Sequence, residues 1–307
     1  MNRKALRGSL LLLFGAVIWG AAFAAQRMGM DHVGPFTFSG VRMLLAGLVM
    51  IPVAAAAGRK VPEKTAEDRK RQRTGGLICG ILLFAATSLQ QIGLVDTAAG
   101  KAGFITALYV VLVPVAGWLI LRNNPGRVIW IGVALAVAAL YLLCVPDTGF
   151  QVERGDLLLL GCAVCFTGQI LCVDHYAPRV SGVALARDEF LVTGGLSMIT
   201  AILTEEIRWD GITEAMIPIL YTGICSGALG YTLQIIGQKE VNPTLASLIM
   251  CLESVFAVLT GAVLLGERMT GREVLGSVLM FTAVILAQLS PVLEGKMKTS
   301  RTEKKED

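Results

Sequence analysis

Residues 89–93 read Leu-Gln-Gln-Ile-Gly, and residues 233–237 read Leu-Gln-Ile-Ile-Gly. The two stretches lie 144 residues apart, and 89–142 matches 233–286 at that offset without a gap. Paired glutamines and glycines carry more weight than paired leucines, because leucine is so frequent in a hydrophobic sequence that leucine pairs often match by chance. The pattern indicates one unit written twice.

A second match marks the start of each unit. Residues 7–13 read Arg-Gly-Ser-Leu-Leu-Leu-Leu and return at 154–160 as Arg-Gly-Asp-Leu-Leu-Leu-Leu, an offset of 147. If each unit crosses a membrane five times, the second unit must be inverted relative to the first. Inverted repeats are typical of secondary transporters, whose binding sites lie between the halves near the membrane midplane.

The composition is that of a membrane protein. Hydrophobic residues make up 54% of the 307 residues and charged residues only 16%, whereas soluble domains carry about 25% charged residues. Apolar runs of about 20 residues cross a hydrocarbon core of about 30 Å, and helices satisfy their backbone groups there. The sequence therefore predicts an all-α integral membrane protein with ten transmembrane helices, at 9–26, 35–57, 75–95, 102–121, 127–145, 156–174, 183–203, 214–237, 243–265 and 271–290.

These spans divide into two inverted five-helix repeats, 8–145 and 154–290, followed by a polar tail at 291–307 that we expect to be disordered and cytoplasmic. With the N-terminus inside, 19 of the 27 Lys and Arg residues fall on inner segments and six on outer ones. This bias predicts a multi-pass protein of the plasma (inner) membrane with both termini cytoplasmic. The basic loop 58–73 then lies near lipid headgroups. No aromatic residues interleave with its charges, so we expect no nucleic-acid partner.

The sequence predicts neither a metal site nor a cofactor. Cys162 and Cys165 have the spacing of metal ligands, but they lie on an apolar helix where cysteine serves as a small packing residue. Both histidines, His32 and His175, fall in predicted loops. The chain has no Gly-x-x-x-x-Gly-Lys-Ser/Thr phosphate loop, so we expect no ATP-driven pumping.

Glu253 is the deepest ionisable residue of the predicted span 243–265. Ionisable groups inside a span are costly and usually face a cavity or a partner. Its counterpart at the offset of 144 is Tyr109, so one symmetric position carries a hydroxyl group and the other a carboxylate. These two side chains could bind substrate, carry a coupling proton, or make a structural hydrogen bond between helices.

Arg42 lies early in the predicted span 35–57, and its counterpart at the offset of 147 is Glu189. Arg42 could contact an anionic substrate, pair with an acid, or extend to the outer surface. Glu189 belongs to an Arg-Asp-Glu run, 187–189, at the head of the span 183–203. For that run the sequence predicts an interfacial position at the inner side.

Other polar and aromatic residues within spans are candidates for lining a cavity. Gln90, Gln91 and Gln234 could bind substrate or join helices, and Gln90 and Gln234 are counterparts. Trp19, Phe23 and Tyr231 could line a cavity or face lipid.

Prolines mark further features of the predicted helices. Pro114 lies inside the span 102–121, where it removes a backbone donor and is a hinge candidate. Asn242 before Pro243 predicts a helix start, and Thr270 with Glu273 predicts a capping box that opens the last span.

Several of these motifs together resemble the EamA-type permeases of the drug/metabolite transporter superfamily. The matching segments are Trp19-Gly20, 38–42, 99–114, 252–256 and 264–270. The resemblance covers about 8–290 and implies ten helices, cytoplasmic termini and a central cavity lined mainly by helices one to four and six to nine. Helices five and ten would be peripheral. The family's diverse cargo includes amino acids, other metabolites and drugs, often exported.

We therefore expect a secondary transporter, not an enzyme, that exports a small polar solute, amino-acid-like or drug-like, by alternating access. Glu253 would make the transport proton-coupled. Two alternatives stay open: a membrane-embedded lipid-modifying enzyme and a non-transporting membrane scaffold. The enzyme would need clustered aspartates or histidines near one membrane face, which the sequence lacks.

Overall fold

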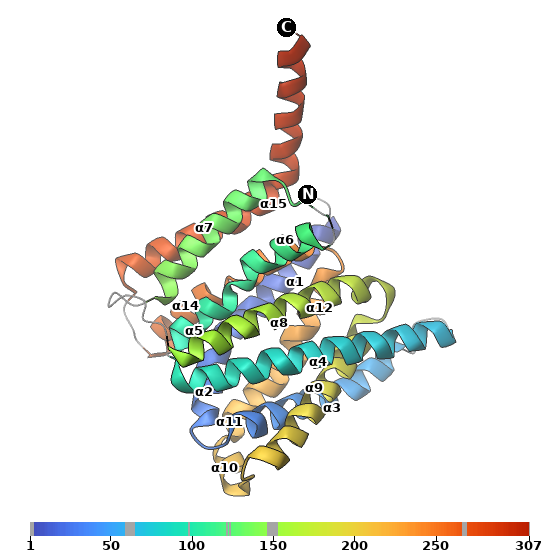
Figure 1. Ribbon diagram of the computed structural model, residues 1–307, viewed down its shortest axis with the longest axis vertical. Coiled ribbons are helices and arrows are strands. Elements are labelled where there is room, and N and C mark those ends of the chain that lie inside the picture. Colours follow the sequence, from blue (N-terminus) through green and yellow to red (C-terminus); the bar gives the residue numbers. More distant parts are fainter. Residues whose placement is uncertain are drawn as a thin grey trace.

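The computed structural model describes residues 3–58, 65–97, 99–120, 122, 124–145, 153–265 and 269–306. Every regular element in these residues is a helix (Figure 1). The first half contains α1 (Arg3–Gly20), α2 (Ala22–Met30), α3 (Pro35–Gly58), α4 (Ala66–Asp96), α5 (Ala99–Ala107), α6 (Tyr109–Leu119) and α7 (Arg127–Cys144). The second half contains α8 (Arg154–Tyr176), η1 (Ala177–Arg179), α9 (Gly182–Thr204), α10 (Trp209–Glu214), α11 (Met216–Leu220), η2 (Tyr221–Tyr231), α12 (Thr232–Gln238), α13 (Pro243–Met250), α14 (Glu253–Leu265) and α15 (Gly271–Glu306).

The helices account for the predicted spans. Within the described residues, nine segments are long and apolar enough to cross a membrane. The remaining predicted span, 183–203, is α9, a helix of 23 residues that carries three adjacent charged residues near its start. The prediction of an all-helical membrane protein is confirmed.

Two helix borders differ from the sequence prediction. The first span begins at Arg3 and ends at Met30, with a break at Ala21 between α1 and α2. Helix α4 begins at Ala66, so residues 66–73 of the predicted loop 58–73 are helical. The reason is a capping box: the Thr65 hydroxyl oxygen accepts from the Asp68 N–H at 3.1 Å, and the Asp68 carboxylate accepts from the Thr65 N–H at 3.2 Å.

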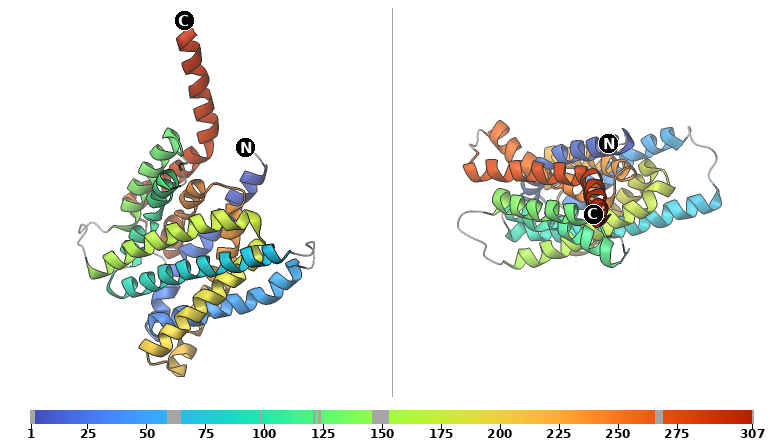
Figure 2. Two further views of the ribbon diagram at one scale, coloured as in Figure 1. Left: turned by 45° about the vertical axis from the view of Figure 1, so that its right-hand side comes forward. Right: turned by 90° about the horizontal axis from the view of Figure 1, so that it is seen from above.

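The last helix extends beyond the last predicted span. Helix α15 (Gly271–Glu306) continues through 291–306, the polar tail of the sequence. Figures 1 and 2 show this part projecting away from the bundle. Lys and Glu are good helix formers, and the apolar part of α15 supplies the turn from which the helix propagates.

The predicted starts of two other helices are confirmed. The Asn242 side-chain oxygen accepts from the Leu245 N–H at 2.8 Å, with Pro243 in the first turn. The Thr270 hydroxyl oxygen accepts from the Glu273 N–H at 3.2 Å, and the Glu273 carboxylate accepts from the Thr270 N–H at 2.7 Å. Both caps satisfy backbone donors that a helix leaves unpaired at its N-terminus.

The two halves interlock through pairs of counterpart helices. Helix α3 packs along its counterpart α9 at one end of the bundle, and α7 packs along its counterpart α15 at the other (Figure 1). The first helix of each half lies against the third helix of the other half: α1 against α12, and α8 against α4. As a result, helices of both halves surround one shared interior.

Counterpart helices also break at counterpart positions. The Leu108 N–H donates to the Ile105 carbonyl at 3.2 Å, and the Leu252 N–H donates to the Ile249 carbonyl at 3.1 Å. Both are i→i−3 bonds, which tighten the helix locally. They separate α5 from α6 and α13 from α14. The predicted hinge, Pro114, lies inside α6 without interrupting it, six residues beyond the break.

Two adjacent glycines of α9 give a matched test of this packing. A Cβ at Gly194 would lie 2.6 Å from the Leu44 backbone nitrogen on α3, whereas a Cβ at Gly195 would meet no heavy atom within 4 Å. Gly194→Ala is expected to destabilise the fold by about 1–3 kcal/mol through overpacking. Gly195→Ala gains up to about 1 kcal/mol of helix propensity. Thermal unfolding of the purified variants in detergent measures both, and equal midpoints would contradict the close α3–α9 contact.

Candidate functional site

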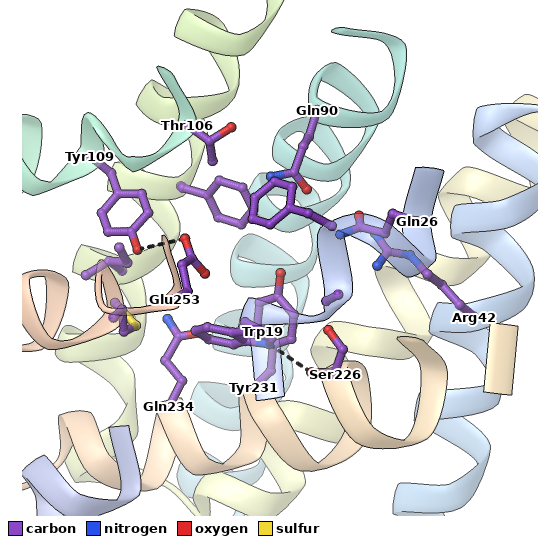
Figure 3. A pocket seen from close by; sticks show the side chains of 15 residues that line it. Trp19, Gln26, Arg42, Gln90, Thr106, Tyr109, Ser226, Tyr231, Gln234 and Glu253 are labelled. Atoms are coloured by element: carbon purple, nitrogen blue, oxygen red, sulfur yellow. Dashed lines mark hydrogen bonds between the residues drawn. The ribbon is translucent and has the colours of Figure 1, made fainter. Parts of the chain in front are cut away.

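A narrow cavity of about 60 Å³ lies at the centre of the bundle, beside the two helix breaks (Figure 3). Fifteen residues line it: Trp19, Ala22, Phe23, Gln26, Arg42, Gln90, Thr106, Tyr109, Phe166, Ile170, Ser226, Tyr231, Gln234, Met250 and Glu253. They come from α1 to α6 and from α8, η2 and α12 to α14. Helix α9 contributes none of them, although the family resemblance implies a lining role for that span.

The cavity inherits the internal repeat of the sequence. Ten of its fifteen lining residues form five counterpart pairs at the offsets of 147 or 144. The pairs are Trp19 with Phe166, Phe23 with Ile170, Gln90 with Gln234, Thr106 with Met250, and Tyr109 with Glu253. The cavity therefore lies on the pseudo-twofold axis between the halves.

Contacts between counterpart residues locate that axis. The Tyr109 hydroxyl donates to Glu253 Oε1 at 3.5 Å, and the Cys251 thiol donates to the carbonyl of its own counterpart, Ala107, at 3.6 Å. The Ala107 carbonyl is available because Val111, which would bond to it in a regular helix, donates instead to Leu108 at 2.9 Å. The breaks thus bring the two halves into direct contact and place a carboxylate at the centre.

A buried guanidinium group occupies another side of the cavity. Arg42 is 3% exposed, its Nε has no hydrogen-bond partner, and its guanidinium carbon lies 5.5 Å from the centroid of the Phe38 ring. Gln26 lies beside it, with an unpartnered buried Oε1 (Figure 3). Figure 3 shows Arg42 and Glu253 on opposite sides of the pocket. Among the described residues, neither belongs to an ion pair.

Aromatic side chains also line the cavity. Trp19 Nε1 donates to the Ser226 carbonyl at 3.1 Å, and the Trp19 and Tyr231 ring centroids are 5.0 Å apart. Ser226 and Tyr231 lie on η2, a π-helix, a form that is frequent at functional sites. The indole of Trp19 thereby joins the first half to the second at the cavity wall.

The structure brings eight of the nine sequence candidates together at this cavity: Glu253, Tyr109, Arg42, Gln90, Gln234, Trp19, Phe23 and Tyr231. Gln91 is fully buried, with both amide atoms unpartnered, but it is not a lining residue. Adjacent residues on a helix point about 100° apart, so Gln90 and Gln91 cannot face the same space.

Several lining residues were not anticipated from the sequence. Gln26, Thr106 and Ser226 are polar residues inside spans, a signal that could have identified them. Met250, Phe166 and Ile170 carry no such signal, because apolar residues are expected anywhere in a span.

Glu189 differs from its two charged neighbours in its burial. Its side chain is fully buried on α9, which packs against α3 and α4, and it contacts Gln169 on α8, while Arg187 and Asp188 pair with each other nearer the surface. The three charged residues differ because each successive side chain turns about 100° around α9.

The polar and aromatic side chains around this cavity suit the binding of a small solute. Within the described chain no group of three or more His, Cys, Asp or Glu residues could hold a metal ion. A buried polar cavity between two repeats of a membrane protein defines a class, the membrane transporters.

The chain belongs to the EamA-like transporter family. The family model matches it twice, over residues 6–145 and 153–289. The protein is thus a multi-pass membrane transporter and not an enzyme, and the family predicted from the sequence motifs is confirmed.

Individual relatives agree with this assignment. An uncharacterised transporter of Archaeoglobus fulgidus is 30% identical over 93% of this chain and 87% of its own length. The uncharacterised inner membrane transporter YedA of Escherichia coli K12 is 24% identical over 92% of this chain and 93% of its own. The uncharacterised transporter YwfM of Bacillus subtilis is 25% identical, covering 92% and 94%.

The fold also has a solved counterpart. One crystal structure superposes with a TM-score of 0.76 at 19% sequence identity, covering 92% of this chain and 96% of the other. At this identity the likeness concerns the fold alone.

Proposed function

We propose that the protein is a secondary transporter that exports a small polar metabolite across the plasma membrane in exchange for protons. The observation that carries this proposal is a cavity with one buried guanidinium and one buried carboxylate on opposite sides, Arg42 and Glu253. Buried charges without a partner are costly, so a ligand that supplies the missing partners is strongly favoured.

The charges specify a class of solute. A carboxylate on the solute would pair with Arg42 through two parallel hydrogen bonds, and a cationic group would pair with Glu253. Trp19 and Tyr231 offer aromatic faces to an apolar or cationic portion. An amino-acid-like zwitterion meets these requirements better than a neutral or purely cationic drug.

The size of the cavity supports alternating access. At about 60 Å³ it holds about four to six water molecules. A metabolite needs the helices around the cavity to separate, and the breaks at Ala21, Leu108 and Leu252 lie beside it. We propose that the repeats 8–145 and 154–290 rock about these points, with Pro114 softening α6.

Glu253 is the proposed coupling acid. It is 7% exposed, lines the cavity and accepts a hydrogen bond from Tyr109. Solute and proton would compete for the same carboxylate, so that loading one displaces the other. Such competition converts a proton gradient into solute export.

The proposed topology places both termini in the cytoplasm of the plasma (inner) membrane. The support is the excess of Lys and Arg on the segments assigned inside, 19 against six. A C-terminal fusion to green fluorescent protein should fluoresce, and the matching alkaline phosphatase fusion should be inactive. The opposite pair of results would reverse the orientation.

The proposed solute class is tested by a thermal-shift screen of the purified protein with a panel of amino acids, their carboxamides and organic cations. A bound ligand stabilises the folded state by RT ln(1 + [L]/Kd), so solutes of the right class raise the unfolding midpoint. We expect stabilisation by zwitterions and none by their carboxamides. Flux of each hit into sealed proteoliposomes then confirms transport. Stabilisation by organic cations alone would refute the assignment.

A further inference from the structure

A second buried carboxylate, Glu189, lies outside the cavity on α9. It is fully buried, and its Oε1 accepts from Gln169 Nε2 at 2.7 Å. Its Oε2 has no hydrogen-bond partner. Among the described residues it belongs to no ion pair. Neither solute binding nor the contact between Tyr109 and Glu253 uses this side chain.

Two amides connect Glu189 to the cavity. Gln234 Nε2 donates to Gln169 Oε1 at 3.2 Å, and Gln234 itself lines the cavity. The same nitrogen also donates to Gln238 Oε1 at 3.3 Å, and Gln238 Nε2 donates to the Ile170 carbonyl at 3.4 Å. The bonds from Gln234 to Gln169 and from Gln169 to Glu189 run toward the Glu189 carboxylate, whereas the branch through Gln238 ends on the Ile170 carbonyl.

No Lys, Arg or His in the described part of the chain forms an ion pair with Glu189. Cys79 on α4 and Tyr231 on η2 are the titratable groups that interact with it electrostatically. Three basic residues on or next to the neighbouring elements are engaged elsewhere: Arg42 with the Phe38 ring, Arg187 with Asp188, and Lys239 with the Val180 carbonyl. A proton on the carboxylate would remove the buried charge.

Protonation would also change the direction of the amide row. A carboxylate only accepts hydrogen bonds, whereas a carboxylic acid donates one as well. If the Glu189 hydroxyl donates to Gln169 Oε1, the Gln169 amide must rotate and present its NH₂ group to Gln234. Gln234 then rotates in turn, and the atom that it offers to the cavity changes.

We propose that Glu189 is a second proton-binding site of this transporter, and that Gln169 and Gln234 transmit its protonation state to the central cavity. The inference extends the proposed proton coupling but does not use Glu253. The cavity would thus respond to two acids: one in its wall, the other behind it.

The test is a pH titration of infrared spectra of the full-length protein in phosphatidylcholine–phosphatidylglycerol vesicles, with protons as the only ligand. The difference between wild type and Glu189→Gln should contain one carboxyl C=O band that changes with pH and exchanges slowly in heavy water. The control Glu67→Gln, whose side chain is 70% exposed, should remove only a hydrated carboxyl band that exchanges at once. Glu189→Asp should keep the slow band at a shifted frequency, which covers the case in which Glu189→Gln fails to fold.

The amides provide the second readout. A glutamine C=O band should change at the same pH midpoint as the Glu189 band and be lost in Gln169→Leu and in Gln234→Leu. Gln169→Leu should also raise the titration midpoint of the Glu189 carboxyl group by about one pH unit, because it removes a hydrogen bond that favours the charged form. Absence of a slow carboxyl band that titrates would overturn the proton site, and a titrating carboxyl without an amide response would overturn its link to the cavity.

The two acids are separable in the same experiment. Glu253→Gln should remove a different carboxyl band and leave the Glu189 band in place. If the Glu253 band does not change with pH while the Glu189 band does, the proposed coupling acid is refuted and the Glu189 site is retained. If only the Glu253 band changes with pH, the Glu189 site alone is refuted.

Discussion

Glu253→Gln is expected to abolish the dependence of solute flux on a pH gradient while leaving the protein folded. In proteoliposomes with a stabilising amino acid as solute, wild-type flux should rise several-fold when the pH gradient is applied. The variant should give the same flux with and without the gradient. Glutamine keeps the shape and hydrogen-bonding capacity of the side chain but cannot exchange a proton. The Tyr109 hydroxyl, 3.5 Å from Oε1, retains an acceptor in the variant.

A trapped pH-sensitive dye measures the proton side of the same exchange. Addition of solute should move protons through wild type and not through Glu253→Gln. The matched control is Glu67→Gln, because that side chain is exposed on α4 and should preserve coupling. Tyr109→Phe removes only the hydroxyl contact and should weaken coupling without eliminating it. Gradient-dependent flux through Glu253→Gln would show that another group carries the proton.

Arg42→Gln is expected to weaken the binding of carboxylate-bearing solutes by about 30-fold or more. Truncating one partner of a buried, hydrogen-bonded charge pair costs about 2–5 kcal/mol, and about 1.4 kcal/mol corresponds to a tenfold change in affinity. Arg42 is 3% exposed and has an unpartnered Nε, so a solute carboxylate would meet little competition from water or from protein groups. Binding is measured by the ligand-induced shift of the unfolding midpoint.

The carboxamide analogue of the same solute separates charge recognition from a general loss of shape. Wild type should prefer the carboxylate strongly, whereas Arg42→Gln should bind carboxylate and carboxamide nearly equally. Arg42→Lys should be intermediate, because lysine keeps the charge but not the planar pair of donors. If Arg42→Gln lowers both affinities by the same factor, Arg42 has only a structural role, for example through its contact with Phe38.

The repeat in the sequence predicted the architecture because one constant offset assigns each residue of the first half a structurally equivalent residue in the second. Gln90 and Gln234 lie at one offset and line one cavity, and so do Tyr109 and Glu253. The helices themselves follow from apolar runs that must satisfy their own backbone groups.

The helix breaks could not be predicted from the sequence alone. Pro114 was the residue expected to interrupt the helix, yet the helix breaks at Leu108. There the Ala107 carbonyl accepts a hydrogen bond from the Cys251 thiol and not from its own helix. That partner lies 144 residues away, so no local pattern contains it. A proline inside a span is tolerated where neighbouring groups compensate the missing donor.

The burial of Glu189 was hidden for a similar reason. A run of three charged residues near the head of a span has the composition of an interface, and composition does not say which way each side chain turns. Packing of α9 between α3 and α4 decides it: Asp188 accepts from Gln72 on α4 at 2.9 Å, and Glu189 faces Gln169 on α8. Sequence patterns specify helices more readily than the rotation of each helix.

The contact between Tyr109 and Glu253 joins two equivalent positions, one in each half. Two identical subunits arranged in this way would hold either two carboxylates or none at the centre, since symmetry copies every residue. Two facing carboxylates resist ionising together, so their charges cannot be set independently. Joining the halves in one chain removes that restriction and allows an odd number of acids on the axis. A single acid at the centre, which titrates without a second acid facing it, is therefore available to this duplicated protein and unavailable to a symmetric dimer of either half.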